Sequence, residues 1–368
     1  MDSTPDNIPP QIPPKTSPQP SPDDLANEIY TWGQVEHTVG HIPVLWREIL
    51  ELLDVQPNKT VLDCTIGRGG HATLIIPQLT GGHYIGLDTD AQNANFARQR
   101  LTPIAEKHNV KLDIIHTNFT AAHDAINSLK PPIPAVDVLL ADLGFASNQM
   151  DDPSRGLSFK GAGPLDMRLD PSQGITAHEL IHQLPERELA DLIYQLGEER
   201  LSRRIARKII ETRTERPIEN TEELADLIRG CYPGGKAWIG GKRPALRFGN
   251  KGRAKGKKGG KNRGGGGMID PATRTFMALR IAVNGELDAL DHLLNELPRL
   301  LQPNGRAGII SFHSLEDRRV KFNFRDHSSG DSPIYKRITR RVLTAQLDEA
   351  DRNPRSRSAK MRVIQKLT

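Results

Sequence analysis

The sequence has little cysteine and no long apolar run. Its two cysteines, Cys64 and Cys231, cannot form a disulfide framework, and neither lies in the Cys-x-x-Cys spacing of zinc and redox sites. Only 36% of residues are hydrophobic, and no segment approaches the roughly 20 apolar residues of a membrane-spanning helix. The first residues lack the basic and apolar segments of a secretory signal. We therefore expect a cytoplasmic protein with no membrane partner and no metal.

Acidic residues are absent from the segment 251–267, which holds seven basic residues and eight glycines. The whole chain has a net charge of +5, so removing these seven positive charges leaves −2 for the rest. The positive charge is thus concentrated in one glycine-rich segment. Two interpretations stay open: an arm that binds phosphate groups, or a solvated linker.

The pattern of elements predicts an α/β protein with an inserted helical domain. Residues 1–36 are rich in proline and polar side chains, which predicts a disordered tail. A helix is expected over 44–53, and β-rich runs at 60–64, 83–88, 111–116 and 136–141 then alternate with helix-length segments such as 91–104. This alternation is typical of a doubly wound, mostly parallel sheet.

From residue 151 the strands stop. Helical periodicity at 177–183, 186–196, 201–214 and 221–229 predicts an insertion over 151–267, which ends in a basic glycine-rich loop at about 240–267. One long helix over 270–297 and a strand over 306–312 then return to the sheet, and 361–367 is a candidate last strand. The core domain is therefore expected to span 37–150 and 268–368.

A glycine-rich turn, Asp63–His71, follows the first predicted strand and precedes a helix. Glycine allows a tight turn and a close approach of a ligand to the backbone. The spacing Gly67-x-Gly69-x-x-Ala72 also fits the looser dinucleotide fingerprint. The turn alone therefore does not distinguish NAD from S-adenosylmethionine.

Side chains at the ends of the next strands favour S-adenosylmethionine. Asp88 closes the second strand, where a carboxylate can accept hydrogen bonds from ribose hydroxyls of either cofactor. Asp63, Phe119 and Asp142 add two acids and an aromatic ring. S-adenosylmethionine carries an ammonium and a sulfonium but no pyrophosphate, so carboxylates attract it and a ring can cover its adenine. Each acid alone could be a turn former or cap, and the joint arrangement favours a cofactor site.

The sequence resembles the bacterial small-subunit (16S) ribosomal RNA cytosine-N4 methyltransferases. The resemblance covers nearly everything from His41 to Val363, and the segments that carry it are 41–45, 63–71, 142–159, 164–168, 197–200, 271–283, 311–321 and 353–362. It implies a Rossmann-like class I methyltransferase core, S-adenosylmethionine as cofactor, and small-subunit ribosomal RNA or the assembling 30S subunit as partner. The cofactor contacts that it carries over fall on Gly69, Gly70, His71, Asp88, Phe119, Asp142 and Gln149.

The chain also departs from this family's pattern. The family usually has two serines and a proline where this chain has Ala146, Ser147 and Asn148, a histidine at Asp270 and a glutamine at Met277.

We expect Asp142 to orient the target amine as well as the cofactor. Ser311, His313 and Glu316 have neither a nucleophile elbow nor a helical histidine pair beside them, which argues against a hydrolase or metal site there.

Clusters of basic residues are candidates for gripping the RNA backbone. The candidate RNA-binding residues are Arg274, Arg318, Arg319, Lys321, Arg355 and Arg357. Other functions stay open from the sequence: a DNA or protein methyltransferase, an NAD-dependent oxidoreductase, and a ribosome-assembly factor that binds RNA without catalysis. A monomer and a homodimer are equally compatible with the sequence.

Overall fold

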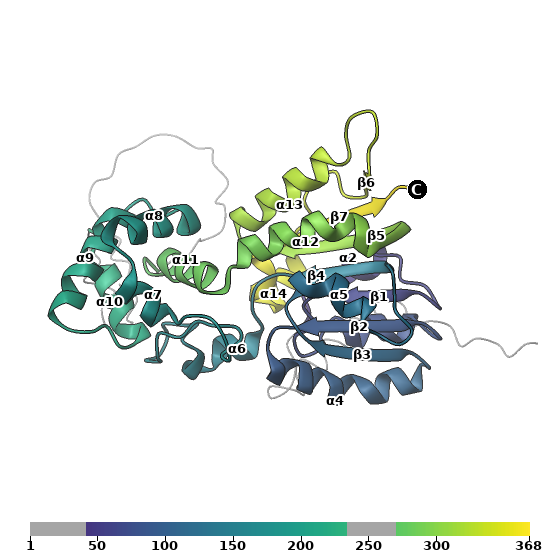
Figure 1. Ribbon diagram of the computed structural model, residues 1–368, viewed down its shortest axis with the longest axis horizontal. Coiled ribbons are helices and arrows are strands. Elements are labelled where there is room, and N and C mark those ends of the chain that lie inside the picture. The colour runs from purple at the N-terminus through teal and green to yellow at the C-terminus, as the bar shows by residue number, and fades with distance from the viewer. Residues whose placement is uncertain (1–41, 234–269) are drawn as a thin grey trace, which may run out of the picture. The chain divides into compact units, whose positions relative to one another are not determined.

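A computed structural model of the protein describes residues 42–233 and 270–368 (Figure 1). The predicted tail over 1–36 and the basic segment 251–267 lie outside these residues. The chain divides into two units, residues 1–42 and 43–368, and the elements described below belong to the second. Within the described ranges, no helix combines the length and the apolar character needed to cross a membrane.

The centre of this unit is a seven-stranded sheet with the order β3-β2-β1-β4-β5-β7-β6. The strands are β1 (Thr60–Asp63), β2 (His83–Asp88), β3 (Lys111–His116), β4 (Val136–Asp142), β5 (Leu301–Ser311), β6 (Tyr335–Arg337) and β7 (Lys360–Lys366). The pairs from β3 through β5 are parallel, whereas β7 runs antiparallel to both neighbours. The prediction of a doubly wound, mostly parallel α/β sheet is confirmed.

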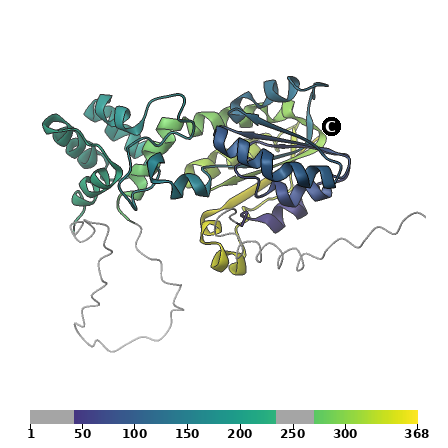
Figure 2. The same ribbon diagram turned by 90° about the horizontal axis from the view of Figure 1, so that it is seen from below.

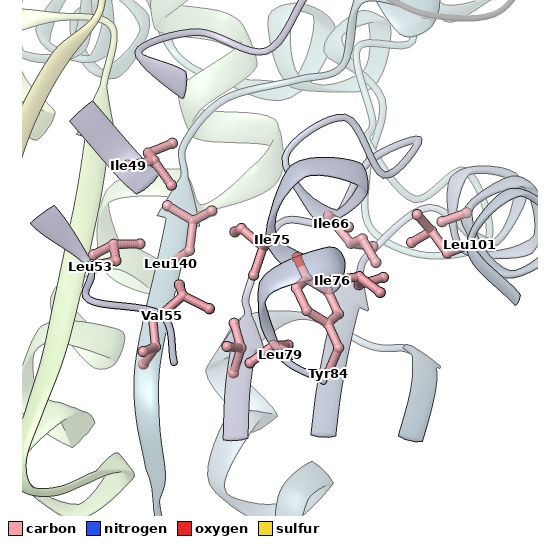
Figure 3. Close-up of a cluster of buried hydrophobic side chains, with 14 of the residues drawn as sticks. Ile49, Leu53, Val55, Ile66, Ile75, Ile76, Leu79, Tyr84, Leu101 and Leu140 are labelled. Atoms are coloured by element: carbon pink, nitrogen blue, oxygen red, sulfur yellow. The ribbon is translucent and has the colours of Figure 1, made fainter. Parts of the chain in front are cut away.

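Helices cover both faces of this sheet (Figure 2). Successive strand residues point to opposite faces, and each face packs against helices in its own hydrophobic cluster. The first cluster holds Val61 and side chains from α2 (Trp46–Leu52), α3 (Ala72–Ile75) and α4 (Ala91–Lys107); Figure 3 shows part of it, with Ile49, Tyr84 and Leu140. The second cluster holds Leu62 and side chains from α5 (Ala122–Asn127), α12 (Glu286–Leu300) and α13 (Ser314–Asp326). The sheet is therefore buried on both sides, as parallel sheets require.

The predicted helical insertion is also confirmed. Its helices are α7 (Ala177–Gln183), α8 (Glu186–Gly197), α9 (Ser202–Glu215) and α10 (Thr221–Gly230). They share a third hydrophobic cluster with α11 (Thr273–Asn284), in which Ile193, Ile205, Leu224 and Phe276 are buried. The insertion thus has its own core, and α11 contributes to that core although it follows the glycine-rich segment in the chain.

Two expectations about elements are wrong. The single helix expected over 270–297 is broken into α11 and α12 at Gly285, which has a φ of +58°. Glycine adopts this left-handed conformation at little cost and ends α11 there. The strand expected to begin at residue 306 begins at Leu301, so residues 301–305 also belong to β5.

Candidate cofactor and active site

The glycine-rich turn follows the carboxyl end of β1 and is hydrogen-bonded to the carboxyl end of β2. Gly67 and Gly69 have φ values of +53° and +80°, a region that side chains disfavour. A Cβ added to Gly69 would also lie 3.0 Å from the Leu101 side chain. The Gly67 amide donates a hydrogen bond of 2.8 Å to the Asp88 carboxylate, which fixes the turn to the end of β2.

Asp88 is buried and accepts hydrogen bonds from the chain with both oxygens. Besides the Gly67 amide, it accepts a hydrogen bond of 2.7 Å from the Asp90 amide. Burial raises the pKa of Asp88 to about 7, and the Gly67 hydrogen bond only partly opposes this rise. Each carboxylate oxygen can accept more than one hydrogen bond, so the contacts with the chain leave capacity for ribose hydroxyls.

Asp63, at the end of β1, has a similar environment. Its carboxylate accepts hydrogen bonds from the Thr65 amide at 3.0 Å and from the Tyr84 hydroxyl at 2.7 Å. Burial raises the pKa of Asp63 to about 6. The hydroxyl of Tyr84, on β2, and the amide of Thr65 thus hold this carboxylate at the start of the turn.

His71 ends the turn and faces Asp142, the last residue of β4. The His71 Nε2 lies 2.9 Å from the Val44 carbonyl oxygen, which can only accept, so Nε2 carries the proton. Burial lowers the pKa of His71 to about 4, so the ring is neutral at pH 7 and its Nδ1 is unprotonated. This Nδ1 lies 3.7 Å from Asp142 Oδ2.

Asp142 has one oxygen directed toward His71 and one without a partner. Its Oδ1 atom is buried and has no hydrogen-bond partner among the described residues. Burial, together with the charges of Asp63 and Glu316, raises the pKa of Asp142 well above its usual value. The unprotonated His71 Nδ1 beside Oδ2 favours the same protonated form. Asp142 is therefore poised to take a donor at Oδ1.

Gln149 anchors α6 (Ser147–Asp151), the short helix after β4. Its Oε1 accepts a hydrogen bond from the Ala146 amide at 2.8 Å, and its Nε2 donates to Asp90 at 2.9 Å. Asp90 also pairs with the Arg155 guanidinium, and both side chains are buried. Sequence reasoning missed Asp90 and Arg155. The position of Asp90 directly before α4, where it accepts from the Gln92 amide, is the signal that could have identified Asp90.

The two remaining predicted cofactor residues are Phe119 and Gly70. Phe119 follows β3 at the start of a short 3₁₀ turn, and its half-buried ring packs against the second hydrophobic cluster. The Gly70 carbonyl accepts a hydrogen bond of 2.7 Å from the Thr73 hydroxyl. All seven predicted cofactor residues thus lie at or after the carboxyl ends of β1 to β4, where parallel sheets bind ligands.

A second polar cluster lies where β5 ends and α13 begins. Glu286, His313 and Glu316 could offer ligand atoms that lie within 4.8 Å of one another. However, both Glu286 oxygens accept hydrogen bonds from Arg280, at 2.7 and 2.9 Å. The His313 Nδ1 faces the Glu316 amide at 3.4 Å, which leaves the proton on Nε2, 3.2 Å from Glu316 Oε1. These contacts engage both carboxylates of the cluster with other groups of the protein.

The six basic residues predicted to bind RNA are not gathered at one place. Arg318 pairs with Glu198 at 2.9 Å, and Arg274 donates to the Glu198 carbonyl at 3.3 Å. Of the others, Arg319 pairs with Asp291, Arg355 with Asp151, and Arg357 donates to the Ala350 carbonyl. Lys321 lies on α13 with Arg318 and Arg319 and lines a pocket together with other basic residues.

Comparisons with known proteins agree with this arrangement. The ribosomal RNA small subunit methyltransferase H of Synechococcus sp. (strain WH7803) is 44% identical over 338 residues, covering 90% of this chain and 96% of that protein. The protein of the same name from Sorangium cellulosum (strain So ce56) is 41% identical, covering 89% and 91%. A solved SAM-dependent O-methyltransferase from Thermotoga maritima aligns with a TM-score of 0.38 and 8% identity, covering 92% of this chain and 71% of that chain. So weak a structural likeness carries no argument.

The family comparison is broader and covers both parts of the chain. The model of the MraW methylase family matches residues 38–367, which include the sheet, the glycine-rich turn and the helical insertion. The turn, the acids at the strand ends and the inserted helices all lie within this match. The chain therefore belongs to the MraW methylase family.

Proposed function

We propose that this protein transfers a methyl group from S-adenosylmethionine to the exocyclic N4 amine of a cytidine in small-subunit ribosomal RNA. The observation that carries the proposal is the set of three carboxylates around one glycine-rich turn, of which Asp63 and Asp88 are buried and Asp142 is partly buried. Family membership and the names of the relatives support the methyl transfer and the RNA substrate. The position of the amine, N4, rests on the sequence resemblance. The proposed setting is the cytoplasm, on ribosomal RNA or an assembling 30S subunit.

The residues present fit S-adenosylmethionine. The buried, unpartnered Oδ1 of Asp142 needs a donor, and the ammonium of the cofactor or the amine of the base can supply one. Asp88 would accept from the ribose hydroxyls, and Phe119 would contact the adenine. Gly69 and Gly70 allow the backbone to approach the ligand, while Gln149 supports α6 beside it. When bound, S-adenosylmethionine supplies an electrophilic methyl group on a positively charged sulfur.

The task of the protein is mainly positioning. The exocyclic amine of cytosine is a weak nucleophile because its lone pair is conjugated with the ring. The transfer forms an N–C bond and breaks the C–S bond, and the methylated, positively charged amine then loses one proton to water. Asp142 accepts a hydrogen bond from the amine and directs its lone pair along the line of transfer, so most of the rate enhancement comes from orientation.

His71 is proposed as a positioning residue for Asp142. Because its Nε2 donates to Val44, its unprotonated Nδ1 faces the Asp142 carboxyl. A proton on Oδ2, which lies 3.7 Å from this nitrogen, leaves Oδ1 as the acceptor for the substrate amine. Asp142 can then orient the amine without placing a full negative charge in a buried site that already contains Asp63 and Glu316.

Replacement of Asp142 tests the catalytic proposal. Asp142→Ala is expected to lower methyl transfer at least about a hundredfold, since it removes a positioned acceptor. The assay measures tritium transfer from labelled S-adenosylmethionine to immature small subunits and to naked ribosomal RNA. Asp124→Ala is the matched control, because Asp124 is an exposed acid on α5 and is expected to leave transfer unchanged. Near-normal turnover of Asp142→Ala would sink the catalytic role.

The same assay separates the other functions that the sequence left open. Transfer to DNA or protein in place of RNA would redirect the proposal to another methyltransferase substrate. Saturable binding of NAD without methyl transfer would favour the oxidoreductase, and RNA binding without transfer would favour an assembly factor. Mass mapping of small-subunit RNA from a deletion strain would identify the modified nucleotide.

A further inference from the structure

A pocket between α13, β6 and β7 is lined mostly by cations. Its lining residues are Lys321, Phe324, Arg325, Arg337, Thr339, Arg340 and Arg362. Five of these seven side chains are positively charged and none is acidic. The stretch between Ser332 and Leu347, which includes β6 and the first part of its connection to β7, also contains no acid; the next acids along the chain are Asp348 and Glu349. An anion is the partner that such a pocket fits.

Only part of this charge is neutralised within the protein. Arg362 pairs with Asp317 at 2.7 Å, and Arg325 pairs with Asp326 at 2.7 Å. Lys321, Arg337 and Arg340 have no acidic side chain within 4.0 Å in the part of the chain that the structure describes. Three like charges around one pocket repel one another, and a bound polyanion would reverse that penalty.

An exposed aromatic ring stands beside these cations. Phe322, on α13, is 42% exposed. Arg325 lies 4.8 Å and Lys321 lies 5.9 Å from the centre of its ring. Cations beside an exposed ring are how proteins hold single-stranded nucleic acid, with bases stacked on the ring and phosphates on the cations. Free phosphate or an acidic peptide would leave the ring unused.

The position of this group relative to the proposed active site is favourable. Helix α13 begins at Ser314, three residues after β5 ends beside the acids of the site. Lys321 and Arg325 lie seven and eleven residues along the helix, which corresponds to roughly 10 and 16 Å. An RNA strand whose target base enters the proposed active site can therefore continue along α13, which is labelled in Figure 1.

We propose that Lys321, Phe322, Arg325, Arg337 and Arg340 form a docking surface for single-stranded RNA that flanks the target base. The cations bind backbone phosphates, and Phe322 stacks on one base. The inference rests on the proposed function for its choice of RNA, and it adds a surface outside the strand ends. Arg318 and Arg319 pair with acids of the protein, so the main phosphate contacts are assigned to Lys321, Arg337 and Arg340, while Arg325 contributes beside the Phe322 ring although it pairs with Asp326.

The test compares two triple variants of the full chain in binding to small-subunit ribosomal RNA. In the first, Lys321, Arg337 and Arg340 are replaced by Ala. We expect affinity to fall at least about tenfold, and the slope of log K against log salt to become shallower by about 2, because each phosphate contact to a single strand contributes about 0.7. The matched control replaces the exposed Lys107, Lys130 and Arg299 by Ala, which removes the same charge elsewhere, and it should leave the slope unchanged.

A separate variant isolates the stacking contact. Phe322→Ala should lower affinity several-fold with an unchanged salt slope, since stacking releases no counterions. In Phe322→Ala and in the triple variant of Lys321, Arg337 and Arg340, the binding of S-adenosylmethionine and the turnover at saturating RNA should match the wild-type chain. The KM for RNA should rise in each. Wild-type salt slope and KM in the first variant would overturn the docking surface. If the wild-type chain transferred no methyl group to RNA, the proposed function would be refuted. A shallower slope of log K against log salt in the triple variant would still support the docking surface.

Discussion

Two carboxyls of the proposed cofactor site change charge near neutral pH. Burial raises the pKa of Asp63 to about 6 and that of Asp88 to about 7. Below these values both groups are neutral, and above them both are negatively charged. The charged forms attract a cationic ligand and accept hydrogen bonds more strongly than the neutral forms. The electrostatic contribution to cofactor binding therefore rises with pH across this interval.

This titration gives a prediction for Asp88. From pH 8 to pH 5.5, the affinity of the wild-type chain for S-adenosylmethionine should fall by about threefold to tenfold more than that of Asp88→Asn, which cannot ionise. Isothermal titration calorimetry at several pH values measures both affinities. Their ratio cancels the titration of the amino group of the ligand itself. A ratio that stays constant with pH would show that Asp88 does not act through its charge.

At this scale the sequence predicted acids and glycines but not their supports. Asp63, Asp88 and Asp142 could be identified because each ends a β-rich run, and such ends meet at one edge of a parallel sheet. The supports could not be identified in the same way. The Tyr84 hydroxyl contacts Asp63 only because β1 and β2 are neighbours, and Arg155 reaches Asp90 across 65 residues of chain.

Among the elements, the break between α11 and α12 depends on one backbone angle. Gly285 has a φ of +58°, and a Cβ added there would meet no atom within 4 Å. A Cβ at Gly230, the last residue of α10, would likewise meet no atom, but its φ lies outside the left-handed region. The two positions thus differ in backbone conformation and not in space.

The pair of glycines gives a controlled prediction. Gly285→Ala should lower the free energy of unfolding by about 1 kcal/mol, because alanine is strained at positive φ. Gly230→Ala should leave it unchanged or raise it by about 0.5 kcal/mol, because alanine restricts the unfolded chain at a compatible site. Thermal unfolding of both variants measures the difference. Equal effects at the two positions would mean that the left-handed angle at Gly285 is not what ends α11.

Long elements with clear periodicity could be predicted, and short or interrupted ones could not. Strands β1 to β4 match the β-rich runs closely. Strand β6 was missed because it has three residues, too few for a period to show, and it pairs only with β7. The helix expected over 270–297 was not divided, since a glycine inside an apolar helical pattern does not reveal its φ.

At the scale of the whole molecule, ion pairs connect the segment 151–267 with the sheet region, and two of them, Arg155–Asp90 and Arg318–Glu198, differ in burial. Arg155 and Asp90 are both buried, whereas Arg318 and Glu198 keep 51% and 44% of their side-chain area exposed. Removing one partner of a buried pair leaves a buried charge, which costs about 3 kcal/mol or more. An exposed pair contributes at most about 1 kcal/mol.

We therefore expect the two connections to respond differently to mutation. Arg155→Met should lower the free energy of unfolding by about 3 kcal/mol, and Asp90→Asn in the same chain should restore part of it by removing the buried charge. Glu198→Gln should change it by less than about 1 kcal/mol. Urea unfolding provides the measurement. A larger loss from Glu198→Gln than from Arg155→Met would reverse this ranking of the two pairs.

The short strand β6 also affects how readily the molecule aggregates with other copies of itself. It forms one edge of the sheet, and an edge strand presents backbone groups that another chain can pair with. Here the edge is three residues long, and two of them, Lys336 and Arg337, are positively charged and exposed. Like charges on two such edges repel, and three residues offer few pairing sites. The cations of β6 thus protect the sheet from edge-to-edge aggregation, in addition to any contact that Arg337 makes with RNA.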